Sequence, residues 1–320
     1  MQLKFKLRLI KNFFIKKIYL YFYKDKIKYN LFDEGEIDKS YNFTYKFMSI
    51  NNAFLKNIIF LFNVIFLNNL KNIIHKIIFK FSNKSKTVPA DLNDLTFNSI
   101  DLSNYSEFYK KNGYCFVENF LDERSYNTVL KYWPSNIFFP PRLSPTKYYS
   151  FSFGFEKQNY EYLKNATTDE KIKTVSNIEY SPILKKLYNF ILSDQNEQNF
   201  SNLYGPNEFW KCYLIFSTIA HEGAYLIPHK DKVNYNREIS SSFNVSFFLD
   251  GMNDDPIKSG ALGLYKDNKF QQPIFIPHNL KNSLLIYDTK KNFFHGFPRI
   301  GEGGHRKTIN IAFLKDNIKD

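Results

Sequence analysis

From Phe209 to the C-terminus the sequence is a succession of short apolar runs separated by polar turn residues, and this succession is the strongest constraint on the fold. Each run is too short for a typical helix, and no helical pattern comes between the runs. Eight short strands of this kind are typical of a sandwich or a double-sheet jelly roll. The expected strands cover residues 209–218, 224–231, 243–249, 261–265, 273–276, 283–287, 293–297 and 306–314.

The segment before these strands mixes expected helices with irregular chain. A short buried strand is expected over residues 113–118 and a helix over 122–133. A second helix is expected over 182–192, because a serine precedes a first-turn proline at its start. Residues 134–180 contain four prolines in their first part and are expected to be irregular. Residues 82–94 are expected to be a linker.

Charge divides the chain into two parts. Residues 1–90 hold 17 Lys and Arg but 5 Asp and Glu, whereas residues 91–320 hold 27 and 26. This asymmetry predicts a basic N-terminal appendage (1–90) joined to a nearly neutral globular domain (91–320) of the α+β class, with a mainly β core and flanking helices. The two cysteines, Cys115 and Cys212, lie in apolar runs and indicate buried thiols in a reducing compartment such as the cytoplasm.

The appendage contains a long stretch without acidic residues. Within residues 53–81 the apolar side chains recur at helical spacing, and lysines mostly occupy the other face. A basic amphipathic helix of this kind can lie on an anionic membrane surface, which would make a cytoplasmic protein peripheral at the membrane. The alternative is a helix packed on the globular domain or on a partner protein. We expect no nucleic-acid partner, because the apolar stripe is too continuous, and no transmembrane span, because the apolar run is too short.

A candidate metal site begins with His229-Lys230-Asp231. Side chains two residues apart leave the same face of a strand, so this imidazole and carboxylate can converge on one ion. His295 lies between an apolar strand and a glycine and can supply a third ligand. Two histidines and one carboxylate form a ligand set that holds iron and leaves open positions. The alternatives are a surface turn for His229 and Asp231 and a hydrogen-bonded core histidine for His295.

A candidate anion site lies eleven residues further on, at the start of the last expected strand. Alternation places Arg306, Thr308 and Asn310 on one face of that strand, opposite Ile309 and Ile311. A guanidinium beside a hydroxyl inside a barrel is suited to holding a carboxylate. The alternative is a surface ion pair.

Together these motifs resemble the iron(II)/2-oxoglutarate-dependent dioxygenases, nearest the prolyl 4-hydroxylase-like branch. The resemblance covers about residues 100–320, and the family's usual paired glycines are replaced here by Gly260-Ala261. The matching segments, in order, are Gly223–Asp231, Ser259–Tyr265, His295-Gly296 and Arg306-x-Thr308.

The resemblance implies a double-stranded β-helix that binds Fe(II) and uses 2-oxoglutarate and O₂ as co-substrates. The reaction it implies is decarboxylation of 2-oxoglutarate to succinate and CO₂, with hydroxylation of a second substrate. The implied iron ligands are His229, Asp231 and His295, and the implied partner of the distal carboxylate of 2-oxoglutarate is Arg306, helped by Thr308. Tyr213 and Asn244 are further candidates for co-substrate contacts, with a structural role as the alternative.

Three other histidines compete for the metal role and are set aside. His221, His278 and His305 have no acidic residue two positions later, and His305 should face away from Arg306. A hypothesis from another class also stays open, a non-catalytic jelly-roll binding module that docks to a membrane or a partner through its N-terminal helix. The sequence leaves open the substrate, which can be a protein side chain, sugar, lipid or small metabolite, and the oligomeric state.

Overall fold

The computed structural model divides into two units, Met1–Thr87 and Val88–Asp320. All residues it describes lie in the second unit, so the predicted helix over 53–81 and almost all of the appendage lie outside them. Within the described part of the chain, no helix has the length and hydropathy needed to cross a bilayer. The described residues are 90–134, 147–153, 166–175, 178–221, 224–230, 242–251, 255, 259–291 and 293–315.

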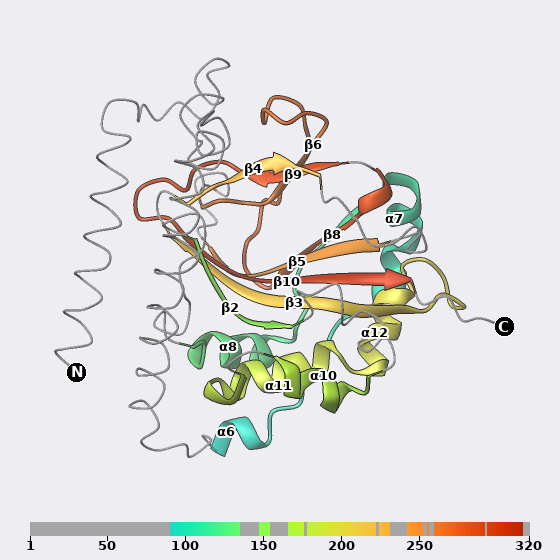
Figure 1. Ribbon diagram of the computed structural model, residues 1–320, viewed down its shortest axis with the longest axis vertical. Helices are drawn as coiled ribbons and strands as arrows, with labels where there is room; N and C mark the ends of the chain where they lie inside the picture. Colours follow the sequence, from blue (N-terminus) through green and yellow to red (C-terminus); the bar gives the residue numbers. More distant parts are fainter. Residues whose placement is uncertain are drawn as a thin grey trace, which may run out of the picture. The chain divides into compact units, whose positions relative to one another are not determined.

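The core consists of two antiparallel sheets (Figure 1). The six-stranded sheet has the order β1 (Tyr114–Val117), β8 (Ser283–Asp288), β5 (Ser242–Gly251), β10 (His305–Lys315), β3 (Trp210–His221) and β2 (Lys147–Phe153). The four-stranded sheet has the order β4 (Leu226–His229), β9 (Phe294–Phe297), β6 (Gly263–Tyr265) and β7 (Pro273–Phe275).

The last eight strands pair in a nested order. The first pairs with the last (β3 with β10), the second with the seventh (β4 with β9), the third with the sixth (β5 with β8) and the fourth with the fifth (β6 with β7). Such nesting is a long hairpin folded over on itself, which is the topology of a jelly roll. The predicted eight strands and their jelly-roll arrangement are therefore confirmed.

In the described part of the chain the helices are α6 (Ala90–Asn93), α7 (Ser106–Asn112), α8 (Glu123–Lys131), α10 (Thr168–Thr174), α11 (Pro182–Ile191) and α12 (Asp194–Ser201), with 3₁₀ turns at Leu102–Tyr105, Ile178–Tyr180 and Thr289–Lys291. Helices α8, α10, α11 and α12 cover the face of the six-stranded sheet that is remote from the four-stranded sheet, whereas α7 lies beside β1 (Figure 1). The predicted helices over 122–133 and 182–192 are confirmed as α8 and α11.

Two predictions about irregular chain are wrong for part of their range. Residues 134–180 contain strand β2, which adds to the edge of the sheet beside β3, and helix α10, which opens with a capping box between Thr167 and Glu170. The prolines are confined to the first part of that segment. The predicted linker 82–94 ends in helix α6, because Leu92 is only 1% exposed and anchors the chain in the core.

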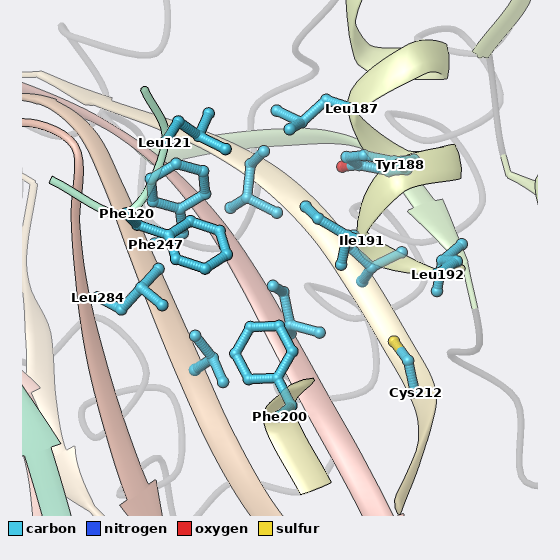
Figure 2. Packing of buried hydrophobic residues seen from close by; sticks show 14 of the residues in the cluster. Phe120, Leu121, Leu187, Tyr188, Ile191, Leu192, Phe200, Cys212, Phe247 and Leu284 are labelled. Carbon is cyan, nitrogen blue, oxygen red and sulfur yellow. The ribbon is translucent and has the colours of Figure 1, made fainter. Parts of the chain in front are cut away.

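The larger apolar cluster lies between the six-stranded sheet and the helices, as Figure 2 shows for part of it. Strand β10 contributes Ile309, Ile311 and Phe313, the face predicted to be apolar, and Phe313 packs against Phe200 and Phe243 with ring centroids 4.8 and 4.7 Å apart. Because alternate residues leave opposite faces, the other face of the same strands lines the space between the two sheets.

One buried ion pair ties the helices to the sheet. The Lys171 ammonium of α10 lies 2.8 Å from the Glu197 carboxylate of α12, and both side chains are almost fully buried. Glu197 also accepts the backbone N–H of Cys212 in β3 and pairs with Lys211. The carboxylate therefore satisfies three donors in a region where an unpaired charge would be costly.

Replacing Glu197 by alanine should lower the free energy of unfolding by about 3–5 kcal/mol, because it leaves the Lys171 ammonium buried without a partner. The control is Asp194→Ala, which removes a 91% exposed partner of Lys211 and should cost less than about 1 kcal/mol. Urea denaturation measures both. Equal losses in the two variants would contradict this account of the pair.

Candidate active site

Two of the predicted metal ligands face each other. His229 ends β4, His295 lies in β9, and the two are direct cross-strand partners with ring centroids 4.4 Å apart. Gly296 permits this approach, because a Cβ at that position would lie 2.5 Å from the Leu226 carbonyl oxygen. The His295 side chain is buried, at 5% exposure, and His229 is partly exposed. Two imidazoles this close can share one metal ion.

The third predicted ligand, Asp231, lies outside the described residues. Among those that are described, no group of three His, Cys, Asp or Glu side chains gathers as a metal site. Of the histidines set aside, the partly buried His305 lies 3.2 Å from Asp250, and the exposed His278 lies 3.5 Å from Glu118. Neither joins the histidine pair, as the sequence predicted.

Arg306 is buried in the space between the two sheets, with only 1% of its surface exposed. Its guanidinium donates to the Gly260 carbonyl at 2.6 Å and stacks 4.1 Å from the ring of Phe297. Within the described part of the chain, no carboxylate pairs with it, and its Nε has no hydrogen-bond acceptor. The prediction that Arg306 points inward is confirmed, and the surface ion pair is excluded for the described residues.

Burial lowers the pKa of Arg306 to about 9. The folded protein therefore holds this proton less tightly than the unfolded chain does. The resulting penalty to folding is present in full below pH 9 and is relieved only above it. At neutral pH the guanidinium is a desolvated cation that lacks a described counter-ion, which makes it a strong site for an anion.

The glycine that receives Arg306 was not singled out from the sequence as a partner. Gly260 has a φ of +77°, a conformation that favours glycine, and a Cβ there would lie 2.8 Å from Ile300. In the sequence, Gly260 stood out only because Gly260-Ala261 replaces the paired glycines usual in the family that the motifs resemble. The role of its carbonyl could not be inferred, since every residue type has the same backbone carbonyl.

A row of polar side chains continues from Arg306 along the inner face of the sheet. The Thr308 hydroxyl is hydrogen bonded to that of Thr218 across β3, and both residues are fully buried. Asn310 donates to Thr308 at 3.4 Å and accepts from Ser246 of β5 at 3.3 Å. Thr308 therefore stands beside Arg306 on the predicted face, within a hydrogen-bonded row.

Tyr213 and Asn244, the other two residues predicted to contact the co-substrate, do not belong to this polar row. Tyr213 lies in β3 where the register with β10 shifts, between the positions paired with Ala312 and Phe313, and it is partly exposed. Asn244 of β5 donates to the phenol oxygen of Tyr287 at 3.3 Å. The ring of Tyr287 lies 5.0 Å from that of His295. Tyr287 was not singled out from the sequence, although it lies two residues after Leu285 in β8 and therefore points to the same inner face of the sheet.

Several solved structures align with the chain, and they belong to the superfamily that its motifs resemble. An oxidoreductase of the 2OG-Fe(II) oxygenase family from Burkholderia pseudomallei is 9% identical over 70% of this chain and 94% of its own, with a TM-score of 0.46. A prolyl hydroxylase from Trichoplax adhaerens, in complex with a hypoxia inducible factor peptide, is 16% identical over 67% and 89%, with a TM-score of 0.45. A Pseudomonas putida prolyl-4-hydroxylase is 11% identical over 68% and 99%, with a TM-score of 0.39.

No protein-family profile matches the chain, and no curated protein matches its sequence. The three structures share at most 16% of their residues with it, and their TM-scores lie below 0.5. The chemistry of the site must therefore be inferred from the side chains of this chain.

Arg306→Met should leave the free energy of unfolding unchanged or raise it by up to about 4 kcal/mol, because it replaces a desolvated charge by an apolar side chain of similar length. If added 2-oxoglutarate raises the melting temperature of the wild type by mass action, the same variant should lose that stabilisation. The neighbour Lys307, which pairs with Asp250, supplies the control Lys307→Met, in which that stabilisation should persist. Marked destabilisation of Arg306→Met would show that the charge serves folding.

Proposed function

We propose that the protein is an Fe(II)- and 2-oxoglutarate-dependent dioxygenase that hydroxylates a second substrate. The observation that carries the proposal is the buried Arg306 guanidinium, for which the described residues supply no carboxylate. A cation in that state is costly to the fold. An external carboxylate that binds the guanidinium would remove this cost and would explain why the charge is buried.

The position of Arg306 relative to the histidine pair supports a short dicarboxylate as that ligand. Phe297 follows His295 by two residues on the same face of β9, which is about 7 Å along a strand. The guanidinium packs on the Phe297 ring. A short diacid can therefore place one end at Arg306 and the other near the two imidazoles.

The residues fit the groups that the proposal requires. His229 and His295 offer two facing imidazoles, and Asp231 follows His229 at the spacing that completes a two-histidine-one-carboxylate set. With Fe(II), 2-oxoglutarate and O₂ bound, such a site supplies oxidative decarboxylation to succinate and CO₂ coupled to hydroxylation of a C–H bond. Because Asp231 would occupy the third ligand position, no site is left there for a halide, which favours hydroxylation over halogenation.

The contributions of the chain itself are binding, orientation and exclusion of water. Arg306 neutralises the distal carboxylate, and its attraction is strong because its surroundings are already dry. Phe248 and Phe297, both fully buried, keep water from that end of the site. Thr308 adds a hydroxyl beside the guanidinium. The histidine pair at the other end fixes where the chemistry takes place.

The alternative is a jelly-roll binding module without catalysis. Such a module could keep the fold and the aromatic core, but it would have no use for a buried cation opposite two facing imidazoles. The combination of Arg306 with His229 and His295 therefore favours the enzyme.

Anaerobic addition of Fe(II) and 2-oxoglutarate should produce a metal-to-ligand charge-transfer band in the visible spectrum of the wild type. Asp231→Ala should abolish the band, because it removes a predicted ligand. His305→Ala removes a histidine that pairs with Asp250 instead, and should leave the band unchanged. Absence of a band in the wild type, or an equal band in Asp231→Ala, would rule out the enzyme.

The hydroxylated substrate can be sought through succinate release. A screen of protein peptides, sugars, lipids and small metabolites for stimulated succinate release would identify its class.

We also propose that the N-terminal appendage holds the cytoplasmic protein at an anionic membrane surface. The supporting feature is the acid-free run from residue 39 to residue 90, with apolar residues at helical spacing over 53–81. Attraction of this kind depends on lysines near the surface and weakens with salt.

Full-length protein should float with vesicles that contain phosphatidylserine, and added salt should reduce the bound fraction. Changing Lys71, Lys76 and Lys80 together to glutamate should abolish flotation by reversing the charge of the polar face. The control changes three exposed lysines of the globular domain, Lys266, Lys269 and Lys281, to glutamate. If both triple variants float alike, the membrane proposal is wrong.

A further inference from the structure

Two side chains of the six-stranded sheet reach across to the four-stranded sheet at the site. Arg306 of β10 contacts Gly260 and Phe297, as described above. Tyr287 of β8 is 5% exposed, and its ring centroid lies 5.0 Å from that of His295 in β9, with an angle of 40° between the ring planes. The proposed function uses the first of these side chains and gives the second no role.

Tyr287 is itself firmly held. It belongs to the apolar cluster between the sheets. It is flanked across its own sheet by Asn244 on one side and Tyr114 on the other. Asn244 donates from its side-chain amide to the phenol oxygen at 3.3 Å. The ring is thus fixed by packing along its body and by a hydrogen bond at its tip.

His295, in contrast, belongs to a strand of only four residues, Phe294–Phe297. The torsion that turns an imidazole about its Cβ–Cγ bond is broad, so the strand backbone alone does not determine where the ring nitrogens point. Among the described residues, two rings contact it, that of His229 at 4.4 Å and that of Tyr287 at 5.0 Å. Only the second comes from the sheet that carries Arg306.

We infer that Tyr287 is a positioning residue, which sets the orientation of the His295 imidazole for metal binding. Through its ring contact it links that imidazole to the six-stranded sheet, which also carries Arg306. The inference rests on the proposed function, since it takes His295 as a metal ligand. Groups that orient a metal-binding histidine typically contribute about 10- to 100-fold to metal affinity. Asn244 then acts through Tyr287, as an anchor for the phenol.

The test is titration of the full-length protein with Co(II), followed by the visible absorption of the bound ion, without 2-oxoglutarate or O₂ turnover. Tyr287→Leu should weaken Co(II) binding about 10- to 100-fold and alter the absorption spectrum, because the ring contact is lost. Tyr287→Phe keeps the ring and should restore most of the affinity. Both variants must first show the wild-type circular dichroism spectrum.

The matched control is Tyr265→Leu. Tyr265 is 3% exposed, lies in β6 beside β9, and packs against Phe270. Its loss removes a buried tyrosine from a neighbouring strand and should leave Co(II) affinity and spectrum unchanged. Wild-type binding by Tyr287→Leu, or equal weakening in Tyr265→Leu, would overturn the inference while leaving the proposed function intact. A wild type that binds no Co(II) would overturn the metal site, and the inference with it.

Discussion

The two faces of strand β10 are the constraint on which the rest of the structure depends. One face places Ile309, Ile311 and Phe313 against the helices and closes the larger apolar cluster. The other carries Arg306, Thr308 and Asn310 into the space between the sheets. Because β10 is hydrogen bonded to β3 on one side and β5 on the other, a shift of one residue would exchange the two sets. The same register therefore specifies the core and the candidate site.

Burial of a guanidinium without a described counter-ion works against folding, and the structure offsets this cost only in part. The Gly260 carbonyl accepts one hydrogen bond, and the faces of Phe297 and Phe248 provide cation–π contacts. The Lys171–Glu197 pair shows the other solution, in which a buried lysine is matched by a carboxylate of the chain. Lys171 has a carboxylate partner within the described part of the chain and Arg306 has none there, and this contrast supports our proposal that Arg306 binds an external carboxylate.

Alternation and turn residues allowed the eight strands, the inward phase of Arg306 and the burial of both cysteines to be predicted from the sequence. His229 and His295 face each other because β4 pairs with β9 in the nested order. The sequence pattern suggested a jelly roll, but it could not show which residue of one strand lies opposite which residue of the other. Tyr287 could not be recognised, because a tyrosine at the end of an apolar run has the same pattern whether it fills a core or contacts a histidine. Strand β2 and helix α6 were missed because local prolines and polar residues suggested loops, whereas tertiary packing decides those segments.

The nested pairing has a consequence for how the protein is made. β3 and β5 flank β10 in the finished sheet, yet both are synthesised long before it. Until β10 emerges from the ribosome, each presents an open edge with unpaired backbone groups, and edges of this kind invite pairing with other chains. Contacts between such distant segments also slow folding. The nascent protein is therefore expected to depend on chaperones until residues 305–315 have been translated, and a premature stop before residue 305 would remove a central strand of the sheet.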